Sequence, residues 1–130
     1  MWWKELNVNV LEGKTLKDIK VKDNKIIFTV DDGTKYKMFH DQCCCEQVYI
    51  EDICGDIKNL IGSPIVMAEE VSNYDMGKLD KWDDSYTWTF YKITTNKGYD
   101  TIRWYGTSNG YYSESVDFEL WQYEDYDLVE

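Results

Sequence analysis

The sequence lacks the patterns by which membrane proteins and many enzymes are recognised. No apolar run approaches the roughly 18 residues that a membrane-spanning helix needs. The N-terminus MWWKELNVNV has no apolar core of an export signal, because Glu and Asn interrupt it. No GxSxG, Walker or dinucleotide-binding fingerprint occurs. We therefore expect a cytoplasmic protein that contacts no membrane, is not an enzyme and keeps its cysteines as reduced thiols or metal ligands.

Basic residues are also scarce, and nearly all of them are lysine. Arginine occurs once, as Arg103, and the net charge is −11. Residues 1–40 hold eight lysines and six acidic residues, whereas residues 41–130 hold six basic and nineteen acidic residues. Such a surface repels nucleic acid, whose phosphates require a basic footprint. It favours a protein partner with a basic surface, and the alternative is that the charge only keeps the protein soluble.

Enough apolar and aromatic residues are present for one folded domain. Hydrophobic residues make up 43% of the 130 residues, which is typical of a globular chain. Proline occurs once, as Pro64, and no internal repeat or low-complexity linker divides the chain. We therefore treat residues 1–130 as a single domain. The pattern carries no indication of the oligomeric state.

Alternating apolar and polar residues predict a protein built mainly of strands. The segment KIIFTVDDGTKYKMFH reads as a hairpin, because Asp32-Gly33 is a strong turn signal between two alternating runs. Tyr86, Trp88 and Phe90 alternate with polar neighbours in the same way. Further strands are expected at 48–53, 64–71, 101–106 and 111–123.

One short helix is expected among these strands. In DIKNLIG, Asp56 can cap a helix near 56–61 and Gly62 can end it. The fold class is therefore α+β, with about seven strands in a mainly antiparallel sheet. The polar segment 72–85 is expected to be a mobile loop, and 124–130 an acidic tail.

The stretch HDQCCCEQVYIEDICGD (40–56) holds the only histidine and all four cysteines. Its candidates for a metal site are His40, Cys44, Cys45 and Cys54, which could meet across two adjacent strands. No standard zinc spacing is present, so the expectation is no cofactor, with zinc as the alternative. The cysteines would otherwise be small core residues or, in one case, exposed.

The segment TIRWYGTSNGYYSES (101–115) combines the single arginine with aromatic and hydroxyl side chains. An arginine between aromatic residues can stack and still bind phosphate or carboxylate through two nitrogens. Three interpretations remain open: a structural hairpin, a surface for a protein partner, and a pocket for a small nucleotide. The candidate binding residues are Arg103, Trp104, Tyr105, Asn109, Tyr111 and Tyr112, joined by Trp88 and Tyr91 from the preceding strand.

Four stretches resemble a family of uncharacterised small acidic bacteriophage and prophage proteins. They are HDQCCCE (40–46), VYIEDICGDIKNLIGSPIVMAEE (48–70), YTWTFYK (86–92) and TIRWYGTSNGYYSESVDF (101–118). The family's motif has an acidic residue where this chain has Cys43, so the resemblance does not support Cys43 as a ligand. The resemblance implies a mobile-element origin and no catalytic residue. By analogy, it also implies an accessory protein that binds host proteins, including defence systems.

Three functions follow from these observations. The first is a non-enzymatic protein that binds and blocks a basic host factor through its acidic, aromatic surface. The second is a nucleotide sponge with a pocket around Arg103. The third is a small metal-binding protein that uses His40 and the cysteines.

Overall fold

Eight strands and two turns of 3-10 helix form the described part of the computed structural model, which covers residues 6–42, 45–72, 77–110 and 112–121. The helical turns are η1 (Val8–Leu11) and η2 (Ile57–Leu60). The strands are β1 (Leu16–Lys22), β2 (Lys25–Val30), β3 (Lys35–Phe39), β4 (Gln47–Cys54), β5 (Ile65–Ser72), β6 (Ser85–Thr95), β7 (Gly98–Ser108) and β8 (Asp117–Leu120).

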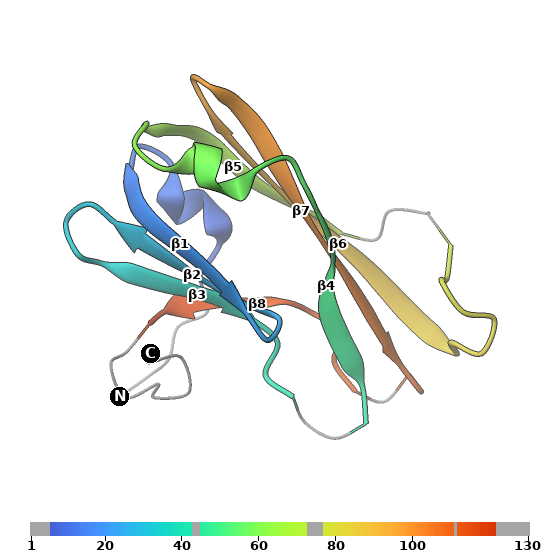
Figure 1. Cartoon of the computed structure of the whole chain (residues 1–130). Coiled ribbons are helices and arrows are strands. Elements are labelled where there is room, and N and C mark those ends of the chain that lie inside the picture. Colours follow the sequence, from blue (N-terminus) through green and yellow to red (C-terminus); the bar gives the residue numbers. More distant parts are fainter. Residues whose placement is uncertain (1–5, 43–44, 73–76, 111, 122–130) are drawn as a thin grey trace.

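These strands form two antiparallel sheets of four strands each. The first sheet has the order β1-β2-β3-β8, and the second has the order β4-β7-β6-β5. In Figure 1 the first sheet lies on the left, the second runs diagonally on the right, and both helical turns lie near the top. The lower ends of β6 and β7 extend beyond the first sheet (Figure 1). Residues 112–116, which we call the strap, lead back toward β8 in the first sheet.

Tight turns explain the hairpins of the first sheet. The predicted hairpin at 25–40 is confirmed, with Phe28 opposite Tyr36 in adjacent strands. Gly33 has a φ of +94°, and the Asp32 side chain accepts a hydrogen bond from the Thr34 amide. This hydrogen bond lowers the pKa of the Asp32 carboxyl. Local turn chemistry therefore sets the register of this hairpin.

The hydrophobic core lies between the two sheets. Its fully buried side chains come from both of them, including Phe28 and Met38 of the first sheet and Ile93 and Ile102 of the second. Leu11 of η1 closes the core at one end. Full burial of a side chain of this size contributes about 1.5–3 kcal/mol. One shared core therefore holds the two sheets together.

The second sheet has an inner face toward this core and an outer face on the other side. In β7, Ile102 and Trp104 belong to the core, so Arg103 and Tyr105 point outward by strand alternation. In β6, Tyr91 and Ile93 point inward, so Trp88 points outward. The two faces carry different chemistry.

The fold is mostly β, which corrects the α+β class expected from the sequence. The helix predicted near 56–61 is only the four-residue turn η2, with the Ile61 amide bonded to the Lys58 carbonyl three residues earlier. Asp56 does cap this turn and Gly62 follows it, but only Leu60 of η2 is buried. Ile57 and Ile61 are only partly buried where they pack against the core. Among the described residues, no helix is long and apolar enough to cross a membrane.

Two other boundaries also differ from the expectation. The run 111–123 was expected to be one strand, but only Asp117–Leu120 pairs, as β8 against β3. The sequence did not predict β1, because its lysines hide the buried pair Leu16 and Ile19. The loop expected at 72–85 is shorter at both ends, because Ser72 belongs to β5 and Ser85 to β6. Residues 77–84 form no helix or strand. Residues 73–76 and the tail at 124–130 lie outside the described residues.

A buried carboxyl lies at the end of the core near η2. Asp100 on β7 is 5% exposed, and burial raises its pKa, with a further contribution from the negative charge of Asp56. The ordinary value is 3.8. Because the folded-state pKa lies above the unfolded one, stability falls as pH rises through this interval. The full penalty therefore remains at neutral pH.

We expect Asp100→Asn to raise the free energy of unfolding at pH 7, because it removes a buried charge. The gain should shrink as the pH falls below the unfolded pKa, where Asp100 is protonated in both states. Urea unfolding at several pH values measures it. Asp31→Asn is the control, since it removes the same charge at an exposed position. An equal gain from both variants would show that net charge, and not burial, is responsible.

Candidate functional site

The residues predicted to form one binding patch are divided between the two faces of the second sheet. Arg103, Tyr105 and Trp88 lie on the outer face, where Trp88 pairs opposite Tyr105 and Phe90 opposite Arg103. Trp88 and Tyr105 pack at a ring distance of 4.7 Å. The Arg103 guanidinium carbon lies 5.9 Å from the centre of the Trp88 ring. These three residues therefore form one cluster, but Trp88 and Tyr105 are 3% and 1% exposed, so the cluster is not a free surface.

Trp104 and Tyr91 correct the prediction, because they lie on the inner face. They are 1% and 0% exposed and belong to the core. Neighbouring residues of a strand point to opposite faces, so Trp104 cannot share a surface with both Arg103 and Tyr105. Asn109 is exposed beyond the end of β7, Tyr112 is half-buried in the strap, and Tyr111 lies outside the described residues.

The side chain of Arg103 is held by two carboxylates of β4. Its Nε donates to Glu51 Oε1 at 2.6 Å, and one terminal nitrogen donates to Asp52 Oδ2 at 3.3 Å. The hydrogen bond to Glu51 raises the pKa of the guanidinium. A phosphate would have to displace these carboxylates, so the geometry gives the nucleotide pocket at Arg103 no support.

The segment 77–84 covers part of the outer face and is fixed to it by hydrogen bonds. The Trp88 indole Nε1 donates to the Gly77 carbonyl at 2.7 Å. The Tyr105 hydroxyl accepts from the Leu79 amide at 3.1 Å and donates to Asp83 Oδ2 at 2.6 Å. Burial and the bond to Asp83 raise the pKa of Tyr105. These three anchors give the segment a defined position on the sheet.

At the tip of this segment, Trp82 projects into solvent. Its side chain is 77% exposed, and the neighbouring Leu79 is also exposed. The Trp82 amide donates to Asp80 Oδ1 at 3.0 Å, so the backbone beneath the ring is held in place. Asp80 and Asp84 are exposed carboxylates that flank Trp82 in the sequence, and the Lys81 ammonium lies 5.2 Å from the centre of the Trp82 ring. An exposed tryptophan on a fixed support is an arrangement suited to protein binding.

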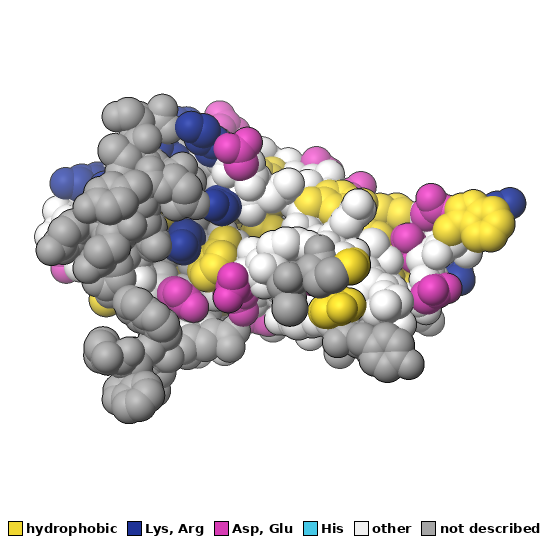
Figure 2. Space-filling model, turned by 90° about the horizontal axis from the view of Figure 1, so that it is seen from below, with side chains coloured by type: hydrophobic (Ala, Val, Ile, Leu, Met, Phe, Trp, Pro, Cys, Tyr) yellow, Lys and Arg dark blue, Asp and Glu magenta, His cyan; other side chains and the backbone are white. Residues whose placement is uncertain are grey.

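Charges are unevenly distributed over the molecule. Figure 2 shows it from below, with most Lys and Arg side chains on the side of the first sheet. Asp and Glu side chains occur along the whole length in this view, with apolar groups between them. The surface of the second sheet and its connections therefore carries apolar side chains among acidic ones.

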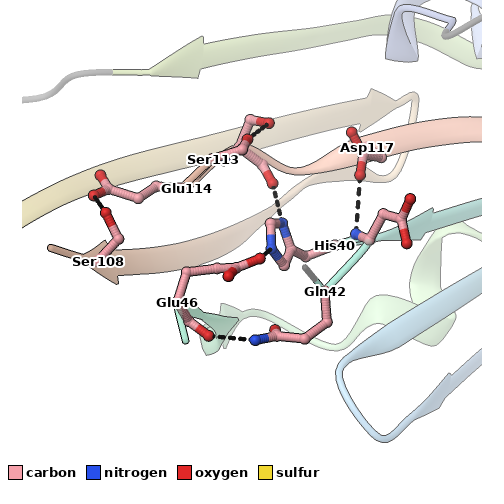
Figure 3. A network of polar contacts seen from close by, with 9 residues as sticks. His40, Gln42, Glu46, Ser108, Ser113, Glu114 and Asp117 are labelled. Atoms are coloured by element: carbon pink, nitrogen blue, oxygen red, sulfur yellow. Dashed lines mark hydrogen bonds and ion pairs between the residues drawn. The ribbon is translucent and has the colours of Figure 1, made fainter. Parts of the chain in front are cut away.

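His40 takes part in a buried network that joins β3 to the strap (Figure 3). Its Nε2 lies 2.7 Å from Glu46 Oε2, and the two side chains are 4% and 0% exposed. Its Nδ1 donates to the Ser115 carbonyl, at 2.7 Å. Gln42 Nε2 donates to the Glu46 carbonyl at 2.6 Å, and the Asp41 amide donates to Asp117 Oδ2 at 3.0 Å. One ring nitrogen of His40 therefore holds the strap, and the other holds Glu46.

The predicted metal candidates that the structure describes form no metal site. Among the described residues, no group of three His, Cys, Asp or Glu side chains is arranged to hold a metal ion. Cys54 is a free, exposed thiol whose Sγ donates to Asp52 Oδ2 at 3.6 Å. Cys44 lies outside the described residues. Cys45 is disulfide-bonded, which corrects the expectation of reduced thiols. That expectation considered only the redox compartment and not which thiols the chain brings together.

Sequence reasoning missed the two features that define these sites. Trp82 was passed over inside a polar loop, although a single tryptophan between charged residues was a visible signal. The pair of His40 and Glu46 carried no signal, because one residue follows β3 and the other precedes β4.

The comparisons with known proteins place the chain in a family. A model described as Domain of unknown function (DUF7448) matches residues 9–118. The chain belongs to this family. No curated protein and no solved structure matches it. Family membership therefore agrees with the resemblance to uncharacterised proteins and adds no activity to the geometry.

Proposed function

We propose that this DUF7448 protein is a non-enzymatic binding protein that docks onto a basic surface of another protein through segment 77–84. The exposed ring of Trp82 on its fixed support carries the proposal. Tryptophan is over-represented among residues that dominate binding energy. Because three hydrogen bonds already fix the segment to the outer face, docking would require little further ordering.

The chemistry of the partner follows from charge. The protein has a net charge of −11, and Asp80 and Asp84 lie near Trp82. Complementary charge speeds association with a basic surface and disfavours acidic partners. Acidic side chains can occupy a groove that otherwise receives the phosphates of a nucleic acid. As an accessory protein of a bacteriophage or prophage, it would block such a host factor in the host cytoplasm, and defence enzymes are the class we propose.

A capture experiment with a matched pair of variants tests this proposal. We expect the protein to retain a basic protein from host lysate at low salt and to lose it at high salt. Trp82→Ala should weaken the interaction about 30-fold, the effect of losing about 2 kcal/mol at a central contact. Tyr99→Ala is the control, because Tyr99 is 61% exposed at the far end of β6 and β7. Equal losses from both variants, or from neither, would argue against segment 77–84 as the contact.

A further inference from the structure

A polar pocket lies on the inner face of the second sheet, beyond the end of the hydrophobic core. Its volume is about 300 Å³, and the ends of β5 and β6 and the strap surround it. Inner-face positions of such a sheet are normally apolar, since they face the core. Here they are hydroxyl and carboxylate side chains: Glu70, Ser72, Ser85, Thr87 and Thr89, with Glu114 from the strap. The pattern of the strands thus changes from apolar to polar where the pocket begins.

The carboxylate of Glu114 is held in a fixed orientation. Its Oε1 accepts a hydrogen bond from the Thr87 hydroxyl at 2.8 Å, and its Oε2 accepts one from the Ser108 hydroxyl at 2.6 Å. A carboxylate has about four acceptor sites, two on each oxygen. Each oxygen therefore retains one acceptor site beyond these two bonds. Figure 3 shows Glu114 reaching Ser108 from the strap.

The hydroxyl of Thr89 provides an independent indication of a ligand. Thr89 is 3% exposed and lines the pocket. Within the described part of the chain, no side-chain hydrogen bond satisfies this hydroxyl. The oxygen is not one of the enclosed polar atoms that lack a partner, so it is accessible from the pocket. A ligand in the pocket can therefore donate a hydrogen bond to it.

The charge of the lining selects the kind of ligand. Two carboxylates line the pocket, and none of its described lining residues is lysine, arginine or histidine. A planar guanidinium donates up to five hydrogen bonds and pairs with a carboxylate through two of them. The fixed Glu114 and the surrounding hydroxyls match these donors. The pocket volume is at the lower end of the range for small-ligand sites, which suits one side chain better than a nucleotide.

We infer that this pocket binds the guanidinium of an arginine side chain on the partner protein. The inference rests on the proposed function and extends it. Ser72 and Ser85 line the pocket, and these same residues begin and end the connection that carries Trp82. The pocket and Trp82 therefore belong to the same end of the second sheet. An arginine near the contact with Trp82 could enter the pocket from the bound partner.

A titration followed by NMR tests the inference without the partner. The probe is N-acetyl-arginine N-methylamide, added to isotopically labelled protein. We expect saturable shifts of the backbone amides of Thr87, Thr89 and Gly110. The matched control ligand is the citrulline counterpart, which has the same shape but a neutral urea group. It should cause no saturable shifts, because the pairing with Glu114 needs a cation.

Two variants show whether the named groups bind the probe. Glu114→Gln keeps the shape of the side chain and should weaken binding about tenfold, the loss of one hydrogen bond between charged groups. Thr89→Val keeps the volume and should weaken binding to a smaller extent. Melting temperatures near that of the parent show that both variants are folded. Equal shifts with the arginine and citrulline probes, or binding unaffected by Glu114→Gln, would overturn the inference.

The outcomes also separate this inference from the proposed function. Trp82→Ala should weaken capture of the partner and leave the shifts with the arginine probe unchanged. If the arginine probe shifts the amides but no partner is captured, the proposed function is refuted and the guanidinium pocket stands. If capture of the partner depends on Trp82 but the arginine probe causes no shifts, only the pocket is refuted. Much stronger binding of spermidine than of the arginine probe would assign the pocket to free polyamines instead.

Discussion

We expect Gly106→Ala to lower the free energy of unfolding by about 3 kcal/mol, the upper part of the range for overpacking a core. Gly106 lies on the inner face of β7 beneath the strap. A methyl group there would lie 2.6 Å from the Glu114 carbonyl oxygen and 3.2 Å from a methyl of Val48. Because the nearest atom belongs to the backbone, the strap itself would have to move. The midpoint of urea unfolding measures the loss, provided that its slope stays constant.

The control is Gly33→Ala, and we expect it to be less harmful than Gly106→Ala. Usually, substitution of a glycine with positive φ is the more harmful one. Gly106 does not have a positive φ, so its backbone conformation suits alanine, whereas Gly33 has a φ of +94°. Gly33 has no atom within 4 Å of an added methyl group, so Gly33→Ala should cost only about 1–2 kcal/mol of backbone strain. A smaller loss at Gly106 than at Gly33 would mean that the strap yields readily and does not define the pocket wall.

Segments governed by local chemistry were predictable from the sequence. The hairpin at 25–40 needs only Asp32-Gly33 and its flanking strands, so the sequence contains all the information for it. Alternation also divided β6 correctly, with Trp88 on one face and Tyr91 on the other. It did not show which face meets the core, because both faces carry aromatic residues. That choice depends on the second sheet packing against the first.

The candidate site was less predictable, because its contacts join residues far apart in the chain. Arg103 pairs with Glu51 across 52 residues, and this pair exists only because β4 lies beside β7. Reasoning from neighbours in sequence left a structural role, a partner surface and a nucleotide pocket open for Arg103. The pocket was missed for the same reason, since it needs the strap to lie over the end of β6.

The strap connects these separate observations. Glu114 bonds to Thr87 and Ser108 of the second sheet, and the Ser115 carbonyl bonds to His40 at the end of the first sheet. Five residues thus bridge both sheets and form one wall of the pocket. Any change that frees the strap should therefore affect stability and binding in the pocket together.

Glu46→Ala is the second change with a large expected effect. The carboxylate of Glu46 is fully buried, 2.7 Å from His40 Nε2, while the other ring nitrogen donates to the Ser115 carbonyl. Both partners of the ring are acceptors, so the pair of His40 and Glu46 shares a proton between Nε2 and Oε2. Removing one member of such a buried pair costs about 3–5 kcal/mol. We expect a loss of this size by urea unfolding and weaker binding of the arginine probe.

Glu46→Gln separates the hydrogen bond from the charge. Its amide can donate to a neutral His40 whose Nδ1 still donates to the Ser115 carbonyl, so the strap keeps its anchor. We therefore expect a loss below about 1.5 kcal/mol, the size of an ordinary hydrogen bond, with binding of the arginine probe retained. If Glu46→Gln were as harmful as Glu46→Ala, the charge itself would be required. If neither variant changed binding of the probe, the strap would be anchored by the bonds of Glu114 alone, because these are its remaining links to the second sheet.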